Sequence, residues 1–412
     1  MLCLIVSLHS HAGPREQARR IHDRLTGVPP TDAMLNAMES AITGGGGAVA
    51  AALYAIDGAP GVAATGDFYT VTVKNWASPW TNESQDPFAA LNDYSATVVG
   101  FVRDELDFRT LLSADVLYRG VVPGIPPYGL SDNRHYEFLE ASGSNLSDPS
   151  VLVRSVQSNL NNLPTAAAAG VMTSRAAARA FFVDGTNRAM LRFTLINHLC
   201  MDLEQLKDAT RPTDRIRQDV SRSPGGDSAL FLNGCVSCHA GLDPLAQAFA
   251  YYNFEYPDEE QEPGLELDQR KDLGSLVYTP GAVQPKYLIN PANFPTGYET
   301  PNDHWTNYWR LGDNSSRVGW RGDAGNSGSV DLATNPAYAE GDGASTLGGE
   351  LANTEAFAYC QVKKAFKAVC LRDPMPTLAE SSAVDGFVNA FNAGGNMKQV
   401  FARVASYCAG HL

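Results

Sequence analysis

Long apolar runs are missing from this 412-residue sequence, and none approaches the ~20 consecutive apolar residues of a membrane-spanning helix. Basic charge is also scarce, because 31 Lys and Arg stand against 45 Asp and Glu and give a formal net charge of −14. So acidic a chain is unsuited to nucleic acid or to anionic membrane surfaces. Nucleophile-elbow, phosphate-loop and zinc-protease motifs are absent as well. What remains is a globular chain, 44% apolar, with room for two or three domains.

Cysteine is sparse, with seven residues, yet two of them fall within one pentapeptide, Cys235-Val236-Ser237-Cys238-His239. C-x-x-C-H is the attachment sequence of a c-type haem, in which two thiols bond the porphyrin and the histidine ligates the iron. A zinc site would need a second Cys or His pair at short spacing, and the other cysteines stand singly. A thioredoxin-like dithiol would need a βαβ setting, which the flanks do not offer. The sequence therefore predicts one covalent haem c, anchored by Cys235 and Cys238, with His239 as the proximal iron ligand.

Four cysteines remain once Cys3 and the two haem cysteines are set aside: Cys200, Cys360, Cys370 and Cys408. Cys360 and Cys370 fall on one expected helix, about 15 Å apart, which is too far to bridge. Each should therefore pair with either Cys200 or Cys408, and both connectivities stay open. Four free buried thiols are the alternative, which is less expected outside the cytoplasm.

The N-terminus carries a short apolar stretch, followed by small residues at the offsets of a cleavage site before Gly13. Residues 1–12 are therefore a candidate signal peptide, although a basic segment is missing before the apolar stretch. Haem c attachment separately favours an oxidising compartment of a bacterium, which is the periplasm or the extracellular space.

Apolar periodicity and capping residues predict a mainly α-helical fold with an N-terminal helical domain (13–125), a helical connector (126–224) and a C-terminal cytochrome c-like haem domain (225–412). Residues 68–74 alternate like a short strand or an extended loop. Residues 256–353, rich in Gly, Pro and Asn, are expected to form long irregular loops. The expected helices cover residues 15–25, 31–41 (capped by Thr31), 92–106, 107–117, 148–160, 174–182, 184–200, 228–233 (capped by Asp227), 354–371 and 396–408, with a shorter helix between the last two. Asp243 is expected to cap one more helix, with Pro244 in first position. Leu245, Phe249 and Tyr252 share one face of that helix, as porphyrin contacts or ordinary core residues would.

The C-x-x-C-H motif does not identify the sixth ligand of the iron. No methionine lies between His239 and Met375, and His304 is the only histidine in that interval. His304 is therefore the candidate distal ligand, with an exposed loop histidine as the alternative. Further candidates are Met375, Met397, Met172 and His198, and an open or water-bound position is also allowed.

Two groups of charged residues flank the haem motif. The first group consists of four arginines: Arg211, Arg215, Arg217 and Arg222. Arginines could bind the haem propionates, but surface ion pairs with Asp214 and Asp219 are the simpler interpretation. An acidic run could steer a basic redox partner or could be a solvated loop; it comprises Asp258, Glu259, Glu260, Glu262, Glu266 and Asp268.

A calcium site is a weaker expectation. Three aspartates fall in glycine-rich loops without the spacing of an EF-hand, so solvated carboxylates are the alternative. They are Asp323, Asp331 and Asp342.

Four segments carry a resemblance to a protein family: residues 24–31 (Arg-Leu-Thr-Gly-Val-Pro-Pro-Thr), 185–188 (Gly-Thr-Asn-Arg), 222–227 (Arg-Ser-Pro-Gly-Gly-Asp) and 235–245. Together they resemble bacterial exported proteins, best known from planctomycetes, with a C-terminal monohaem cytochrome c-like domain. The resemblance implies an exported protein with a covalent haem, and it supplies no substrate.

An electron-transfer cytochrome outside the cytoplasm is the leading functional hypothesis, with no catalytic residue assigned. A variant of it is self-assembly that stacks haems between subunits. The alternatives are a peroxidase-like haem enzyme with an open distal site, and a binding protein to which the haem domain is appended.

Overall fold

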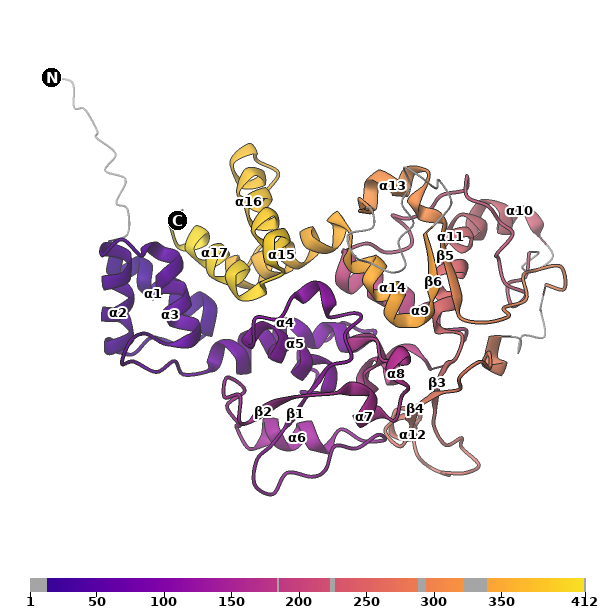
Figure 1. Cartoon of the computed structure of the whole chain (residues 1–412), viewed down its shortest axis with the longest axis horizontal. Helices are drawn as coiled ribbons and strands as arrows, with labels where there is room; N and C mark the ends of the chain where they lie inside the picture. Colours follow the sequence, from indigo (N-terminus) through magenta and orange to yellow (C-terminus); the bar gives the residue numbers. More distant parts are fainter. Residues whose placement is uncertain (1–12, 184, 223–226, 288–293, 322–338, 411–412) are drawn as a thin grey trace.

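The computed structural model describes residues 13–183, 185–222, 227–287, 294–321 and 339–410. Helices dominate this part of the chain, and its strands form three two-stranded antiparallel sheets. Figure 1 shows the first and last helices at one end of the molecule and the segment around the C-x-x-C-H motif at the other. The mainly α-helical class is confirmed, while the haem domain and the boundaries at 125 and 224 stay predictions. The candidate signal peptide, residues 1–12, lies outside the described residues.

The two ends of the chain pack together. α1 (Pro14–Thr26), α2 (Asp32–Thr43) and α3 (Gly47–Asp57) contact one another, and α17 (Met397–Gly410) lies against α1 and α3. Thr31 caps α2, as predicted, by accepting a hydrogen bond from a backbone N–H of the first turn at 3.2 Å. The sequence did not predict α3, because a run of four glycines directly before its body suggested a stop.

Helix α5 (Asp93–Arg103) is the buried centre of the first half of the chain, since every one of its residues is buried. Its Gly100 faces the ring of Tyr118 so closely that a Cβ there would lie 2.3 Å from the ring. This close approach lets strand β1 (Leu117–Gly120) pack directly against the helix. β1 pairs in antiparallel register with β2 (Leu152–Ser155).

Two expected helices, residues 107–117 and 148–160, are therefore wrong in large part. Their apolar residues serve the β1–β2 pair instead, with Leu117 opposite Ser155 and Gly120 opposite Leu152. Cross-strand pairing between segments over thirty residues apart overrides the local helical pattern.

Residues 68–74, expected as a strand or an extended loop, are helical. They form the π-helix η1 (Phe68–Val73), in which Phe68, Tyr69 and Val73 are buried on one face. The alternating β-branched residues resemble a strand. The buried residues, however, follow Phe68 by one and five positions, which does not match the two-residue alternation of a strand.

The remaining elements of the first half are short. They are α4 (Lys74–Ala77), η2 (Ser78–Thr81), η3 (Phe108–Thr110), α6 (Arg134–Ala141), α7 (Gln157–Asn161), η4 (Thr165–Ala167), η5 (Gly170–Thr173) and α8 (Arg175–Phe181).

The second half begins with α9 (Arg188–Thr194), which continues as η6 (Leu195–Leu199). The expected loop region, residues 256–353, holds short strands and helices between irregular segments. One hydrophobic cluster joins buried side chains from Ala18 to Ala409. None of the described helices combines the length and apolar character that a membrane crossing requires. The other elements are α10 (Ser228–Leu230), η8 (Phe231–Cys235), α11 (Val236–Ala246), η9 (Gln247–Phe249), β3 (Tyr252–Glu255), α12 (Leu267–Lys271), β4 (Ser275–Tyr278), η10 (Pro285–Tyr287), β5 (His304–Asn307), η11 (Tyr308–Arg310), α13 (Asp313–Val318), β6 (Ala339–Asp342), α14 (Gly343–Ala352), α15 (Glu355–Cys370) and α16 (Leu378–Gly394).

Two disulfides tie α15 to its neighbours. Cys360 joins Cys200, with Cα atoms 5.3 Å apart, and Cys370 joins Cys408, with Cα atoms 5.7 Å apart. The expectation that Cys360 and Cys370 pair elsewhere is confirmed, and the structure selects one of the two open connectivities. Disulfides of this kind suit an oxidising compartment.

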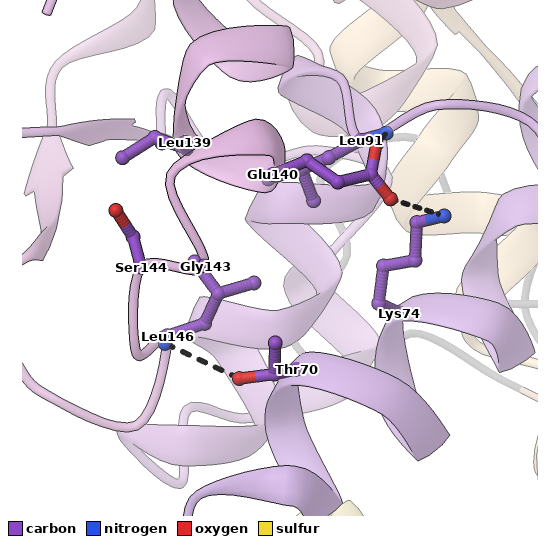
Figure 2. Close-up of a pocket in the computed structure, with 8 residues that line it drawn as sticks. All are labelled: Thr70, Lys74, Leu91, Leu139, Glu140, Gly143, Ser144 and Leu146. Carbon is purple, nitrogen blue, oxygen red and sulfur yellow. Dashed lines mark hydrogen bonds and ion pairs between the residues drawn. The ribbon is translucent and has the colours of Figure 1, made fainter.

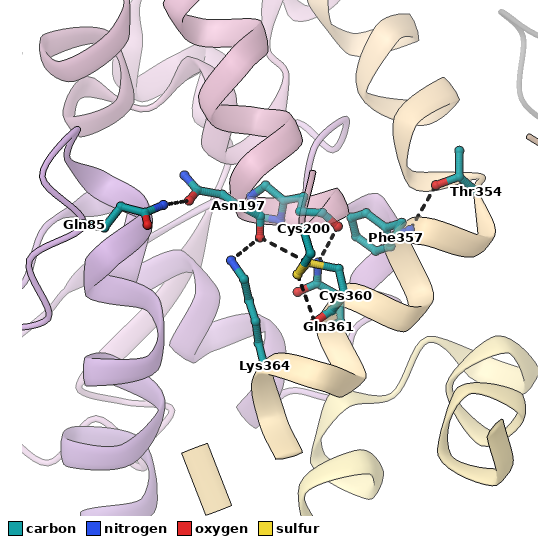
Figure 3. Close-up of a disulfide and its surroundings, with 9 residues drawn as sticks. Gln85, Asn197, Cys200, Thr354, Phe357, Cys360, Gln361 and Lys364 are labelled. Carbon is teal, nitrogen blue, oxygen red and sulfur yellow. Dashed lines mark hydrogen bonds between the residues drawn. A yellow bond between two sulfur atoms is a disulfide. The ribbon is translucent and has the colours of Figure 1, made fainter. Parts of the chain in front are cut away.

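A lysine lies beside the first disulfide (Figure 3). The Lys364 ammonium donates to the backbone carbonyl of Asn197 at 2.5 Å and lies 4.7 Å from the centre of the Trp80 ring. Burial lowers the pKa of this ammonium to about 7. Within the described residues Lys364 forms no ion pair, so its charge is stabilised by one carbonyl and one aromatic face.

Candidate haem-attachment site

The C-x-x-C-H motif spans the junction of two helical segments. Cys235 ends η8, and Cys238 and His239 lie on the first turn of α11. Asp227 caps the helix that leads into the motif, as predicted, by accepting from backbone N–H groups of α10. The two thiols are free and half-buried, so both are open to reaction. Burial raises the pKa of the Cys238 thiol and favours its protonated form.

His239 is oriented by an aspartate one helical turn further along α11. Its Nδ1 lies 3.1 Å from a carboxylate oxygen of Asp243, which is completely buried. An ionised carboxylate accepts the proton of Nδ1 and leaves the lone pair on Nε2. Nε2 makes no hydrogen bond within the described residues, so this nitrogen is the one that a metal can take.

Asp243 was expected to cap a helix that starts at Pro244, and this is wrong. α11 runs without a break through both residues, and the carboxylate points to other elements. Arg188 of α9 donates to it at 2.6 and 3.0 Å, and the backbone N–H of Arg217 donates at 3.1 Å. A charged side chain with three such donors gains more by facing them than by capping a helix end.

The charge of Asp243 is fixed by its neighbours. Burial alone would raise the pKa of this carboxyl group, but the positive charges of Arg188 and Arg217 outweigh burial, and the His239 hydrogen bond adds to them. The pKa of Asp243 therefore lies far below its usual range, and the carboxylate stays ionised at neutral pH.

A second carboxylate completes the cluster. Asp219 pairs with Arg188 at 2.9 Å and lies 3.6 Å from the Arg217 guanidinium, which also donates to Thr186 at 2.6 Å. The expected surface ion pair of Arg217 is thus a buried one. We refer to Arg188, Arg217, Asp219 and Asp243 as the charge cluster. Its formal charges cancel, and it links α9, the segment that carries Arg217 and Asp219, and α11.

The other three arginines considered for the haem propionates make local contacts. Arg211 pairs with Asp208 at 3.1 Å, Arg215 donates to the Tyr298 hydroxyl at 2.6 Å, and Arg222 lies 4.3 Å from the centre of the Phe294 ring. Asp214, expected as an ion-pair partner, instead accepts a hydrogen bond from the hydroxyl of Tyr308. A role for these arginines toward haem propionates stays a prediction.

Apolar side chains are exposed next to the thiols. Leu230 and Leu232 keep 56% and 62% of their surface in solvent, directly before Cys235. Leucines beside two free thiols and an oriented imidazole fit a porphyrin, whose faces and edges are apolar. The residues present therefore fit the cofactor that the motif implies.

The candidate distal ligands lie in different settings. His304, in β5, has its Nδ1 2.9 Å from Asp342 and its Nε2 3.5 Å from Glu340, so iron ligation would displace a carboxylate. His198 is buried and its Nε2 contacts the Tyr94 hydroxyl at 2.6 Å. Met172 and Met397 are buried, and Met375 is exposed. His304 as the sixth ligand stays a prediction.

The aromatic stripe after the motif belongs to the hydrophobic core. Leu245, Phe249 and Tyr252 are fully buried, and Phe182 stacks on Tyr252 with ring centres 5.4 Å apart. Of the two interpretations, porphyrin contact or ordinary core, the structure favours the core. Tyr252 lies in strand β3 rather than on the helix.

Calcium ligation gains no support from the described residues. Asp342 pairs with His304, and Asp323 and Asp331 lie outside the described part of the chain. In that part, no three side chains among His, Cys, Asp and Glu gather in a way that could hold a metal ion.

The acidic run after the haem motif is largely exposed, as a solvated loop or a partner surface requires.

A small cavity lies away from the motif, in the first half of the chain (Figure 2). Its volume is about 40 Å³, and Lys74 and Glu140, which form an ion pair at 2.8 Å, are among the residues that line it. Leu91, Leu139 and Leu146 supply much of the apolar lining. A cavity of this size holds one or a few water molecules rather than an organic ligand.

Sequence reasoning missed the charge cluster as a unit. Its signals were nevertheless present: His239 and Asp243 stand four residues apart on a helix, and Arg188 lies in the Gly-Thr-Asn-Arg segment.

Searches against protein-family models, curated proteins and solved structures find no match to this chain.

Proposed function

We propose that the protein is a monohaem c-type cytochrome that transfers electrons outside the bacterial cytoplasm. The observation that carries the proposal is the C-x-x-C-H motif with two free thiols and an imidazole whose Nε2 is open. Cys235 and Cys238 would hold the porphyrin, and His239 would bind the iron. The haem, when bound, supplies one-electron chemistry.

Charge and disulfides support the location and the kind of partner. Two disulfides suit the periplasm or the extracellular space. The chain carries a net charge of −14, and the acidic run 258–268 is largely exposed after the motif. A basic redox partner would be attracted by this field, with an association rate that falls as salt is raised.

Haem attachment is the direct test. The full chain, exported in a bacterium with an active cytochrome c maturation system, is expected to gain the mass of one haem and the absorption spectrum of haem c. The Cys235→Ala/Cys238→Ala variant should lose both while keeping the same disulfides. A colourless wild-type protein of unmodified mass would overturn the proposal.

The sixth ligand can be tested through the spin state of the iron. Replacing His304 with Ala should convert low-spin ferric iron to high-spin iron, because it removes the axial nitrogen. Met375→Ala is the control, since Met375 is 49% exposed and should leave the spectrum unchanged. An unchanged His304→Ala spectrum, or a spin change in Met375→Ala, would show that the assignment is wrong.

A haem enzyme is the second candidate, and the buried carboxylate behind His239 favours it because such a partner raises the basicity of a metal ligand. Cyanide and peroxide binding separates the two functions. Low-spin iron that binds neither supports the electron carrier, whereas high-spin iron that binds both supports the enzyme.

A further inference from the structure

The partner of the proximal histidine is a carboxylate, and this carboxylate also accepts two hydrogen bonds from the Arg188 guanidinium. The basicity of a ligand imidazole depends on the group to which its Nδ1–H donates. Here that group is a carboxylate with no exposed surface, so its charge acts through a medium of low polarity.

We infer that Asp243 is a positioning residue that makes His239 an electron-rich iron ligand and thereby lowers the reduction potential of the haem. The inference rests on the proposed function and extends it, since it names the group that tunes the site.

The contacts of Asp243 also hold the His239 imidazole in one orientation. His239 and Asp243 lie one turn apart on the same helix, and the carboxylate is held from the other side by Arg188 and the backbone of Arg217. A carboxylate held in this way cannot follow the imidazole if the ring rotates. The ring is thus kept with its proton on Nδ1 and its lone pair on Nε2.

The sign of the effect follows from the balance of the charge cluster. Its two arginines and two aspartates cancel in formal charge, but Asp243 is the member that touches the iron ligand. Removing its charge makes the imidazole less basic and leaves an unbalanced positive charge beside it. Both changes favour the reduced, less positive iron, so the potential should rise.

The test compares two carboxylates of the same cluster. Asp243→Asn and Asp219→Asn each remove one negative charge from the partners of Arg188, but only Asp243 contacts His239. In the haem-loaded full chain, we expect a clearly larger rise of the midpoint potential in Asp243→Asn than in Asp219→Asn. A purely structural role would shift both potentials alike.

The outcomes separate the inference from the proposed function. Equal potentials in the two variants, or a fall in Asp243→Asn, overturn the inference while the haem remains. A wild-type chain that takes up no haem overturns the proposed function and the inference with it.

A second measurement covers the case in which Asp243→Asn does not fold. Nitrogen NMR of the Cys235→Ala/Cys238→Ala chain, above the titration range of imidazole, reports the tautomer of His239, assigned with His239→Gln. A proton on Nδ1 supports the role of Asp243, and a proton on Nε2 overturns it.

Discussion

Replacing Arg188 with Met is expected to lower the free energy of unfolding by about 3–5 kcal/mol, because it leaves two buried carboxylates with Arg217 as their only cationic partner in the charge cluster. Asp219 and Asp243 keep only 6% and 0% of their side-chain surface in solvent, and each accepts two hydrogen bonds from this guanidinium. Methionine fills a similar length but supplies no charge. Urea unfolding of the purified full chain, followed by circular dichroism, measures the difference.

Arg192→Met is the matched control. Arg192 lies four residues further on, at the same helix α9, and also holds one aspartate with two hydrogen bonds, but its pair with Asp202 is 45% and 34% exposed. Exposed pairs contribute about 0–1 kcal/mol. A loss in Arg188→Met as small as that in Arg192→Met would show that the charge cluster does not hold the site together.

The second large effect concerns pH and Lys364. Its pKa is about 7 in the folded chain against 10.5 for an unperturbed lysine, so the unfolded chain binds more protons between these values. Stability should therefore rise with pH, with a contribution from Lys364 of about 1–2 kcal/mol between pH 7 and pH 9. The cost of the partly buried ammonium is full below pH 7 and vanishes above the unfolded pKa.

Lys364→Met should remove this part of the pH dependence, and it should stabilise the chain more at pH 7 and below than at pH 9. Lys367→Met is the control, because Lys367 lies on the same helix with 66% of its side chain exposed. Unfolding midpoints at several pH values check the prediction. The control should keep the wild-type slope, and a slope that persists in Lys364→Met as well would contradict the prediction.

Local signals in the sequence predicted local structure well. Thr31 and Asp227 each accept backbone hydrogen bonds of a helix start, and the helix expected over residues 354–371 is α15 (Glu355–Cys370), with Thr354 as its cap. A capping side chain contacts atoms two or three residues away, so its chemistry is legible in the sequence.

Signals that depend on distant partners were misread. Residues 148–160 have a helical pattern, yet they supply β2 because β1 pairs with it. Asp243 before Pro244 has the sequence of a helix cap, yet Arg188, fifty-five residues earlier, draws its carboxylate into the interior. No periodicity encodes such a partner, and only the assembled fold brings the charges together.

The packing of α17 on α1 and α3 also bears on when the protein can fold. α1 and α3 can contact α17 (Met397–Gly410) only after all the residues between them have been synthesised. Closing a loop of nearly the whole chain is slow compared with local helix formation. This packing is thus among the later steps of folding, and an export route that carries unfolded chains would deliver the polypeptide before α17 has met α1 and α3.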